Sequence, residues 1–327
     1  MTLAGKAKRN AYAGFFCWFL ILFLQLDVYY AFDLIEKVVL FGVLVVVPLG
    51  LAIVEIPGFK DPKFYWWSVF LQPFSAVAAA WSLFIDKGVE AAILASFTLL
   101  LHIVIALLGL SRILDRGLLP IHEFSIDAGL IYLPVAGFWF VVYRLGIQPF
   151  DFSETIILLT VVHFHFAGFA TPIIAGLVAR FLASDTRFRA PLTLSILAII
   201  TSMPLVAFGI SLAPLVALFG AILLTVGTTI LGIITLGWVQ RMMPSPLSRL
   251  ALIISAVANL AAMVMACLYA YSIVTKILIF DIPKMARFHG LLNAFGFVAC
   301  SLIVWSSVQI SEPKTPGTFV TAKGSNL

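Results

Sequence analysis

The chain has 327 residues, of which 62% are hydrophobic and 11% charged, and its mean hydropathy is +1.13. A soluble domain carries about a quarter charged residues, so this composition excludes a water-exposed globular protein and indicates a membrane protein. The net charge of +5 comes from basic residues in short connections, which orient membrane proteins, and it does not indicate a nucleic-acid partner.

A membrane-spanning helix needs about 20 mainly apolar residues. In chain order, the sequence predicts about ten such spans and therefore an all-α, polytopic transmembrane helix bundle over residues 1–310. The spans are 11–31, 38–56, 64–85, 90–111, 126–143, 154–180, 191–209, 213–239, 250–274 and 287–308. No small-residue cleavage site follows the first span, so we expect it to be retained. The tail, 311–327, is rich in Pro, Gly, Thr and Ser and is predicted to be disordered and cytoplasmic.

The basic residues orient this bundle. Of the 20 lysines and arginines, 14 fall on the side of the N-terminus and six on the other side. The six are Lys37, Lys87, Arg144, Lys276, Lys284 and Arg287. The positive-inside rule then predicts a multi-pass protein of the cell membrane with both termini cytoplasmic.

Few polar side chains lie deep in the predicted spans. They are His102, His163, His165, Asn259, His289 and Asn293, with Asp127 nearer the inside edge. Such groups are costly at membrane depth and usually have a partner or a function. We therefore expect His163, His165, His289, Asn293 and Asp127 to be catalytic, with the histidines of the sixth and tenth spans in one cluster in the outer half of the membrane. The alternative is that each histidine only bonds a neighbouring helix.

The spacing of His163 and His165 argues against a metal site. Residues two apart on a regular helix point about 200° apart, so the two imidazoles cannot bind one metal, and zinc-type ligand spacing is absent. We expect no metal and no cofactor, with one imidazole facing an internal cavity and the other contacting a neighbouring helix. A haem bound by His102 together with His163 or His165 is an open alternative.

Two carboxylates, Glu123 and Asp127, lie four residues apart at the start of the fifth span. Glu123 or Ser125 is predicted to cap this helix, and Asp127 either belongs to the same cap or is a buried, protonated acid that donates a proton. Aromatic residues accompany the histidines. We expect Phe164, Phe166, Phe169, Trp139 and His102 to line an apolar substrate site.

The runs from Leu159 to Phe169 and from His289 to Phe297 resemble motifs of the YndJ-like family of bacterial multispanning membrane proteins. The first run resembles that family's central motif, and the second run its second motif. The segments Asp127 to Gly129 and Tyr132 to Pro134, with the region of Trp139, are also similar. The resemblance implies a multispanning protein, for which transporter has been a provisional label, and implies no catalytic role for any residue.

The residues themselves favour a membrane-embedded enzyme. Histidines and a carboxylic acid in an aromatic-lined cavity suit acid–base chemistry on a lipid or isoprenoid, including chemistry like that of a terpene cyclase. The alternatives are a transporter of a small or lipophilic molecule and a membrane protein without chemistry. The expected partner is a membrane lipid or a hydrophobic small molecule.

Overall fold

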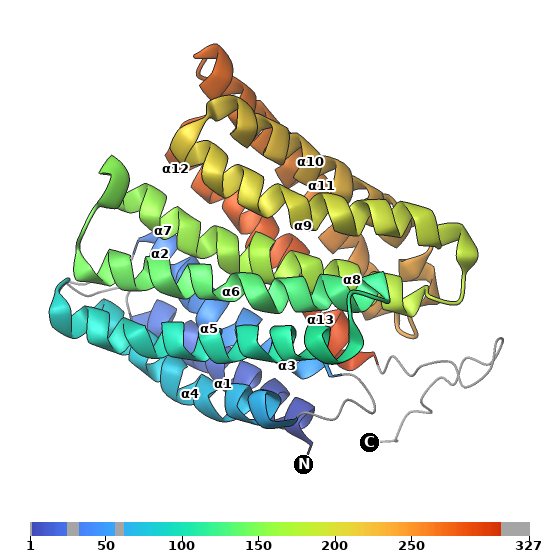
Figure 1. Cartoon of the computed structure of the whole chain (residues 1–327), viewed down its shortest axis with the longest axis horizontal. Helices are drawn as coiled ribbons and strands as arrows, with labels where there is room; N and C mark the ends of the chain where they lie inside the picture. Colours follow the sequence, from blue (N-terminus) through green and yellow to red (C-terminus); the bar gives the residue numbers. More distant parts are fainter. Residues whose placement is uncertain (1, 25–32, 56–61, 309–327) are drawn as a thin grey trace.

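The computed structural model describes residues 2–24, 33–55 and 62–308, and this part of the chain is a bundle of antiparallel helices (Figure 1). Its long helices are α1 (Leu3–Leu24), α4 (Pro62–Phe84), α5 (Val89–Arg116), α6 (Ile121–Leu145), α9 (Arg189–Leu212), α10 (Pro214–Gly237) and α11 (Pro246–Thr275). Short turns of 3₁₀-helix follow α6, α8 and α10; they are η2 (Pro149–Asp151), η4 (Thr186–Phe188) and η5 (Val239–Met242).

Three further spans each contain a π-helical segment, in which an extra residue widens the turn. The first is α2 (Leu34–Phe41), η1 (Gly42–Val46) and α3 (Val47–Ile53); the second is α7 (Glu154–His163), η3 (Phe164–Ala170) and α8 (Thr171–Phe181); the third is α12 (Ile282–Lys284), η6 (Met285–Gly290), η7 (Leu292–Ala299) and α13 (Cys300–Ser307). Segment η3 contacts both η1 and η7. Because π-turns often mark functional positions, this meeting point directs attention to the middle of the bundle.

Nine helical segments of the described chain are long and apolar enough to cross a membrane, and they coincide with the second to tenth predicted spans. The first predicted span, 11–31, overlaps α1, which begins at Leu3; residues 25–31 lie outside the described part, as does the tail 311–327. The all-α, polytopic fold class is confirmed.

The spans differ in how deeply they are buried. In the most apolar window of the span Leu34–Ile53, 83% of residues are buried, against 33% for α10. Large apolar side chains on outer helices, such as Phe16, Trp67 and Phe74, are exposed. A soluble protein rarely exposes apolar patches of this kind, so lipid is the solvent of these faces and the span Leu34–Ile53 is a central helix of the bundle.

Successive spans run in opposite directions, so the bundle has two ends. We call the end at which α1 begins the Leu3 end, and the other the opposite end. Helices α5 and α6 pack closely, as do α9, α10 and α11. In Figure 1, α1 begins next to the N label at the bottom, and α7 begins at the left, at the opposite end of the bundle.

Candidate functional site

A pocket of about 220 Å³ lies in the half of the bundle nearer the opposite end. It is bounded by α7 and η3, by α10 and α11, and by the span from α12 to η7, and most of its lining is aliphatic or aromatic. The polar side chains that line it include His163, His289, Asn293 and Asn259. Ligand sites are typically apolar hollows with a few convergent polar groups, so this pocket is the candidate site.

His163 and His289 lie together in this pocket. Their ring centroids are 6.4 Å apart, and the ring planes are tilted by 26°. The Nδ1 atom of His163 lies 2.7 Å from the Leu159 carbonyl oxygen, and that of His289 lies 2.8 Å from the Ala262 carbonyl oxygen. A carbonyl oxygen only accepts, so each Nδ1 carries the hydrogen and donates it. In the neutral ring, Nε2 then has a free lone pair, and it lies on the side of the ring away from that carbonyl.

Two amide side chains accompany the imidazoles. Asn293 donates from Nδ2 to the His289 carbonyl oxygen at 3.1 Å. The same Nδ2 lies 3.4 and 3.3 Å from Nδ1 and Nε2 of His289, so the amide nitrogen also contacts the ring nitrogens, and Nε2 accepts from it. Asn259 donates from Nδ2 to the Thr228 carbonyl oxygen at 3.1 Å, while its buried Oδ1 has no partner among the described residues.

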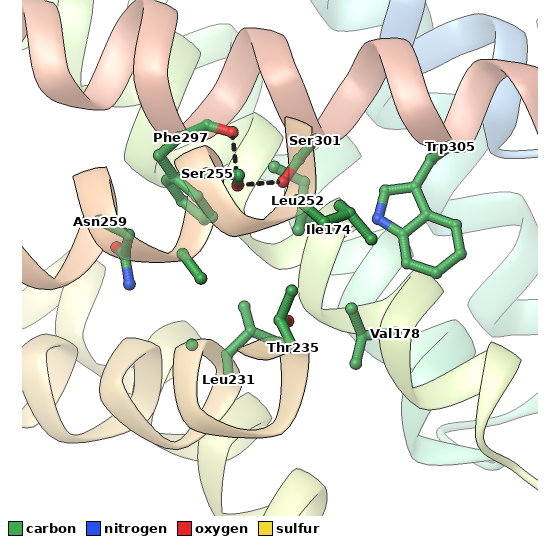
Figure 2. A pocket seen from close by; sticks show the side chains of 12 residues that line it. Ile174, Val178, Leu231, Thr235, Leu252, Ser255, Asn259, Phe297, Ser301 and Trp305 are labelled. Atoms are coloured by element: carbon green, nitrogen blue, oxygen red, sulfur yellow. Dashed lines mark hydrogen bonds between the residues drawn. The ribbon is translucent and has the colours of Figure 1, made fainter. Parts of the chain in front are cut away.

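A second, much smaller cavity of about 10 Å³ adjoins the pocket through Asn259 and Phe297, which line both (Figure 2). The Ser255 and Ser301 hydroxyls are 2.6 Å apart here, and Ser255 also donates to the Phe297 carbonyl oxygen. This volume is about that of one water molecule, so the smaller cavity is too small to hold an organic ligand.

His165 belongs to a different environment from His163. It is fully buried, and its ring centroid lies 5.1 Å from that of His102, at an interplanar angle of 71°. Its Nδ1 donates to the Val161 carbonyl oxygen at 2.8 Å. Gly42 and Gly137 make room for the pair: a Cβ on Gly42 would lie 3.1 Å from the His165 ring, and one on Gly137 would lie 3.0 Å from His102 Nδ1. The expected single cluster is therefore two pairs, His163 with His289 and His165 with His102, divided by the helix that carries His163 and His165.

Asp127 lies far along the bundle from these histidines, in an ion-pair network at the Leu3 end. Its Oδ1 lies 2.6 Å from Arg112 Nε, and its Oδ2 lies 2.6 Å from Arg116 Nη2. Glu123 pairs with Arg112 at 2.8 Å and with Arg180 at 2.6 Å. Helix α6 begins at Ile121 after Pro120, so Glu123, Ser125 and Asp127 all lie inside it and none of them caps it. The capping interpretation is wrong, because the arginines compensate the charges that had suggested a helix boundary.

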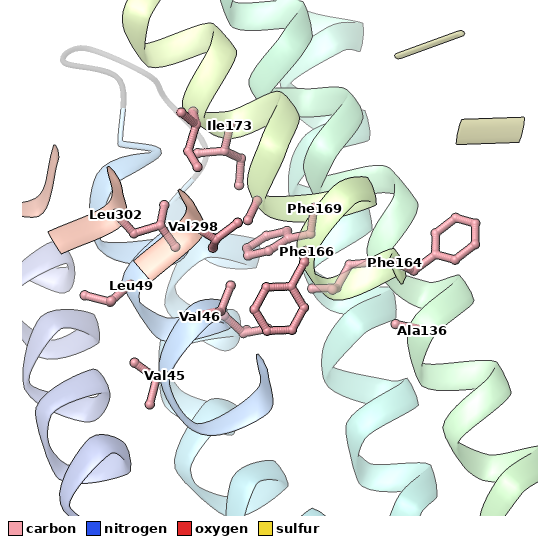
Figure 3. Packing of buried hydrophobic residues seen from close by; sticks show 14 of the residues in the cluster. Val45, Val46, Leu49, Ala136, Phe164, Phe166, Phe169, Ile173, Val298 and Leu302 are labelled. Atoms are coloured by element: carbon pink, nitrogen blue, oxygen red, sulfur yellow. The ribbon is translucent and has the colours of Figure 1, made fainter. Parts of the chain in front are cut away.

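The predicted aromatic residues separate into one that lines the pocket and three that do not. Phe166 lines it. Phe164 and Phe169 are buried, and in Figure 3 the ring of Phe164 points away from the side of η3 on which the rings of Phe166 and Phe169 lie. Trp139 packs against Phe152, with ring centroids 5.8 Å apart. His102, which was also expected to bind substrate, lies in the second histidine pair.

The sequence matches the YndJ-like protein family over residues 37–297. The chain belongs to the YndJ-like family. An uncharacterized membrane protein YndJ of Bacillus subtilis (strain 168) is 28% identical over 200 residues, which is 61% of this chain. That alignment spans 36% of the length of the Bacillus protein. No solved structure matches the chain.

This YndJ-like chain uses some residues that sequence reasoning did not select. Thr160, Thr171, Thr228 and Tyr269 line the pocket, and their types carry no signal of their own in a membrane helix. The ion-pair network, in contrast, could have been predicted from the spacing of its charged residues. Arg112 and Arg116 are four residues apart at the end of one helix, and Glu123 and Asp127 are four apart at the start of the next. Two antiparallel helices joined by a short turn bring such pairs together.

Proposed function

We propose that this membrane protein binds a small lipophilic molecule, a lipid or an isoprenoid, in the pocket between α7, α11 and the span from α12 to η7, and that His163 and His289 accept protons from it. One observation carries the proposal. Both imidazoles donate from Nδ1 to a backbone carbonyl, which leaves their Nε2 lone pairs in one mostly apolar pocket, with that of His289 3.3 Å from the Asn293 amide nitrogen. A positioned imidazole is the commonest general base in enzymes.

The proposed chemistry is base-assisted rather than acid-initiated. None of the described residues that line the pocket is an aspartate or a glutamate. Asp127, the expected proton donor, is fully buried beside Arg112 and Arg116 and does not line the pocket. A cyclisation started by a carboxylic acid therefore receives no support from this pocket.

Transport of a lipophilic molecule is the second candidate, and the π-helical segments favour it. Three spans interrupt their regular helical turns where η1, η3 and η7 meet. Transporters commonly place irregular helices around a site near the middle of the membrane. The two candidates differ in outcome, since an enzyme changes the bound molecule and a transporter releases it unchanged.

The experiment is to identify what copurifies with the protein. Ala270 lines the pocket on α11, whereas Ala261 on the same helix is exposed to lipid. We expect mass spectrometry of extracted lipids to find one species enriched with the wild type and with Ala261→Trp, and lost with Ala270→Trp, whose indole fills the pocket. The same enrichment in all three proteins would contradict the proposal.

A second measurement separates enzyme from transporter. The identified molecule is incubated with the protein in D₂O and returned to H₂O, which removes deuterium from hydroxyl groups, and mass spectrometry then follows deuterium retained on carbon or product formation. An enzyme with a working base exchanges or converts the molecule, and His163→Gln, which keeps an acceptor near the Nε2 position but is not basic, abolishes that change. A molecule that stays unchanged supports transport instead.

A further inference from the structure

Most hydrogen-bond donors of the pocket already donate to backbone carbonyls. The hydroxyls of three lining threonines donate to carbonyls of their own span, and the ring and amide N–H groups described above donate to carbonyls as well. The threonine pairs are Thr160 with Ile156 at 2.9 Å, Thr171 with Phe166 at 3.0 Å and Thr228 with Leu224 at 2.9 Å. The donors left for a ligand are the second N–H of Asn259 and the Tyr269 hydroxyl, which can also accept.

Three acceptors of the same pocket receive no hydrogen bond from any described residue. They are Nε2 of His163, Oδ1 of Asn293 and Oδ1 of Asn259, whereas Nε2 of His289 lies 3.3 Å from the Asn293 amide nitrogen. Buried acceptors without a donor are destabilising, so a ligand that brings O–H or N–H groups into the pocket gains hydrogen bonds that the protein does not supply.

The lack of charged side chains in the described pocket lining further restricts which ligands can bind. No lysine, arginine, aspartate or glutamate is among the described lining residues. Arg287 and Lys284, on the neighbouring turns, are exposed and do not line it. An anionic carboxylate or phosphate would lose its hydration and would face acceptor lone pairs that repel it. An ammonium group would be buried without a carboxylate to pair with. Both are costly in an apolar pocket.

We propose that the ligand is an uncharged lipophilic alcohol, or a similar molecule with a neutral hydrogen-bond donor, and neither a fatty acid nor an isoprenoid diphosphate. This inference rests on the proposed function of the pocket. The volume of about 220 Å³ is below the usual range of about 300 to 1,000 Å³ for ligand pockets. It fits a small terpene alcohol, or the hydroxyl end of a longer chain whose tail lies between helices.

The test uses four probes with the same ten-carbon chain: 1-decanol, decanoate, decyl phosphate and decylammonium. Binding of radiolabelled 1-decanol is measured on the full chain in nanodiscs, with Ala270→Trp as the blank for partition into lipid. Ala266→Trp, which fills the same pocket, is a second blank in case the first variant does not fold, and Ala261→Trp is the matched control.

We expect wild type and Ala261→Trp to bind more labelled decanol than the blanks, and unlabelled decanol to compete at least about ten-fold better than any charged probe, which corresponds to roughly 1.4 kcal/mol. Equal or better competition by decanoate, decyl phosphate or decylammonium would overturn the alcohol assignment while leaving the pocket's function intact. No binding of any probe above the blanks would overturn the proposed function, and with it this inference.

Discussion

At the scale of single residues, the two nitrogens of His163 have separate tasks, and substitution can separate them. Asparagine keeps an N–H near the Nδ1 position and loses the Nε2 acceptor, whereas glutamine keeps an acceptor near the Nε2 position. We predict that His163→Asn weakens alcohol binding by about 1 kcal/mol, roughly five-fold, and that His163→Gln stays near wild type. Equilibrium binding of labelled decanol measures the affinity of both variants. Weaker binding by His163→Gln than by His163→Asn would show that Nδ1, and not Nε2, matters for the ligand.

His165 gives a contrasting prediction, because it lies outside the pocket lining. We predict that His165→Asn, which keeps the N–H toward the Val161 carbonyl, leaves decanol binding within about two-fold of wild type. A side chain that only bonds within a bilayer helix contributes about 0.6 kcal/mol, so thermal stability should fall only slightly. Loss of binding in this variant would mean that both histidine pairs belong to one site.

The sequence showed that the two histidines face different sides, and it could not show which of them faces a cavity. The helical period alone separates His163 from His165. The choice between them depends on η3, because an added residue in a π-turn rotates everything after it, and on Gly42 and Gly137, which open space for the rings of His165 and His102. These are tertiary features that no local pattern in the chain reports.

At the scale of helices, the ion-pair network of Arg112, Arg116, Glu123, Asp127 and Arg180 connects α5, α6 and α8 at the Leu3 end. Asp127 is fully buried. Removing one partner of a buried pair leaves an uncompensated charge and costs about 3–5 kcal/mol. We predict that Asp127→Asn lowers the thermal unfolding temperature in detergent substantially, and that Arg116→Gln added to it restores part of the loss.

The control for this prediction is the ion pair of Lys87 and Glu154, whose side chains are 29% and 47% exposed. Exposed pairs contribute little, so Glu154→Gln should leave the unfolding temperature near that of wild type. An Asp127→Asn protein as stable as wild type would show that the network does not hold these helices together.

Most helix bounds could be predicted from apolar length alone, because lipid requires every span to bond its own backbone. The predicted break near Gly209 to Pro214 is close to the observed end of α9 at Leu212. The predicted start of the fifth span at 126 was wrong by five residues, since α6 begins at Ile121. The predicted span left out the turn that carries Glu123, whose charge is paired with Arg112 of α5 and Arg180 of α8 inside the bundle.

At the scale of the whole molecule, the orientation in the membrane is a prediction from the 14 basic residues on the N-terminal side. The turn before α9 lies at the Leu3 end, and the turn before α5 lies at the opposite end. In a protein whose Cys17, Cys267 and Cys300 are replaced, we predict that Asp86→Cys reacts with an impermeant thiol reagent on intact cells. Ser184→Cys should react only after lysis. Equal reactivity of both on intact cells would contradict the proposed topology.

Photolabelling can show directly whether a lipophilic molecule occupies the pocket of His163 and His289. The full chain in nanodiscs is irradiated with a diazirine-bearing long-chain alcohol, and peptide mass spectrometry locates the label. We predict label on pocket residues such as Met263, Tyr269 and Met285, reduced by excess decanol and absent in Ala270→Trp. Label found only on lipid-facing residues such as Trp67 and Phe74, and unchanged by excess decanol, would show that the pocket does not bind such a molecule.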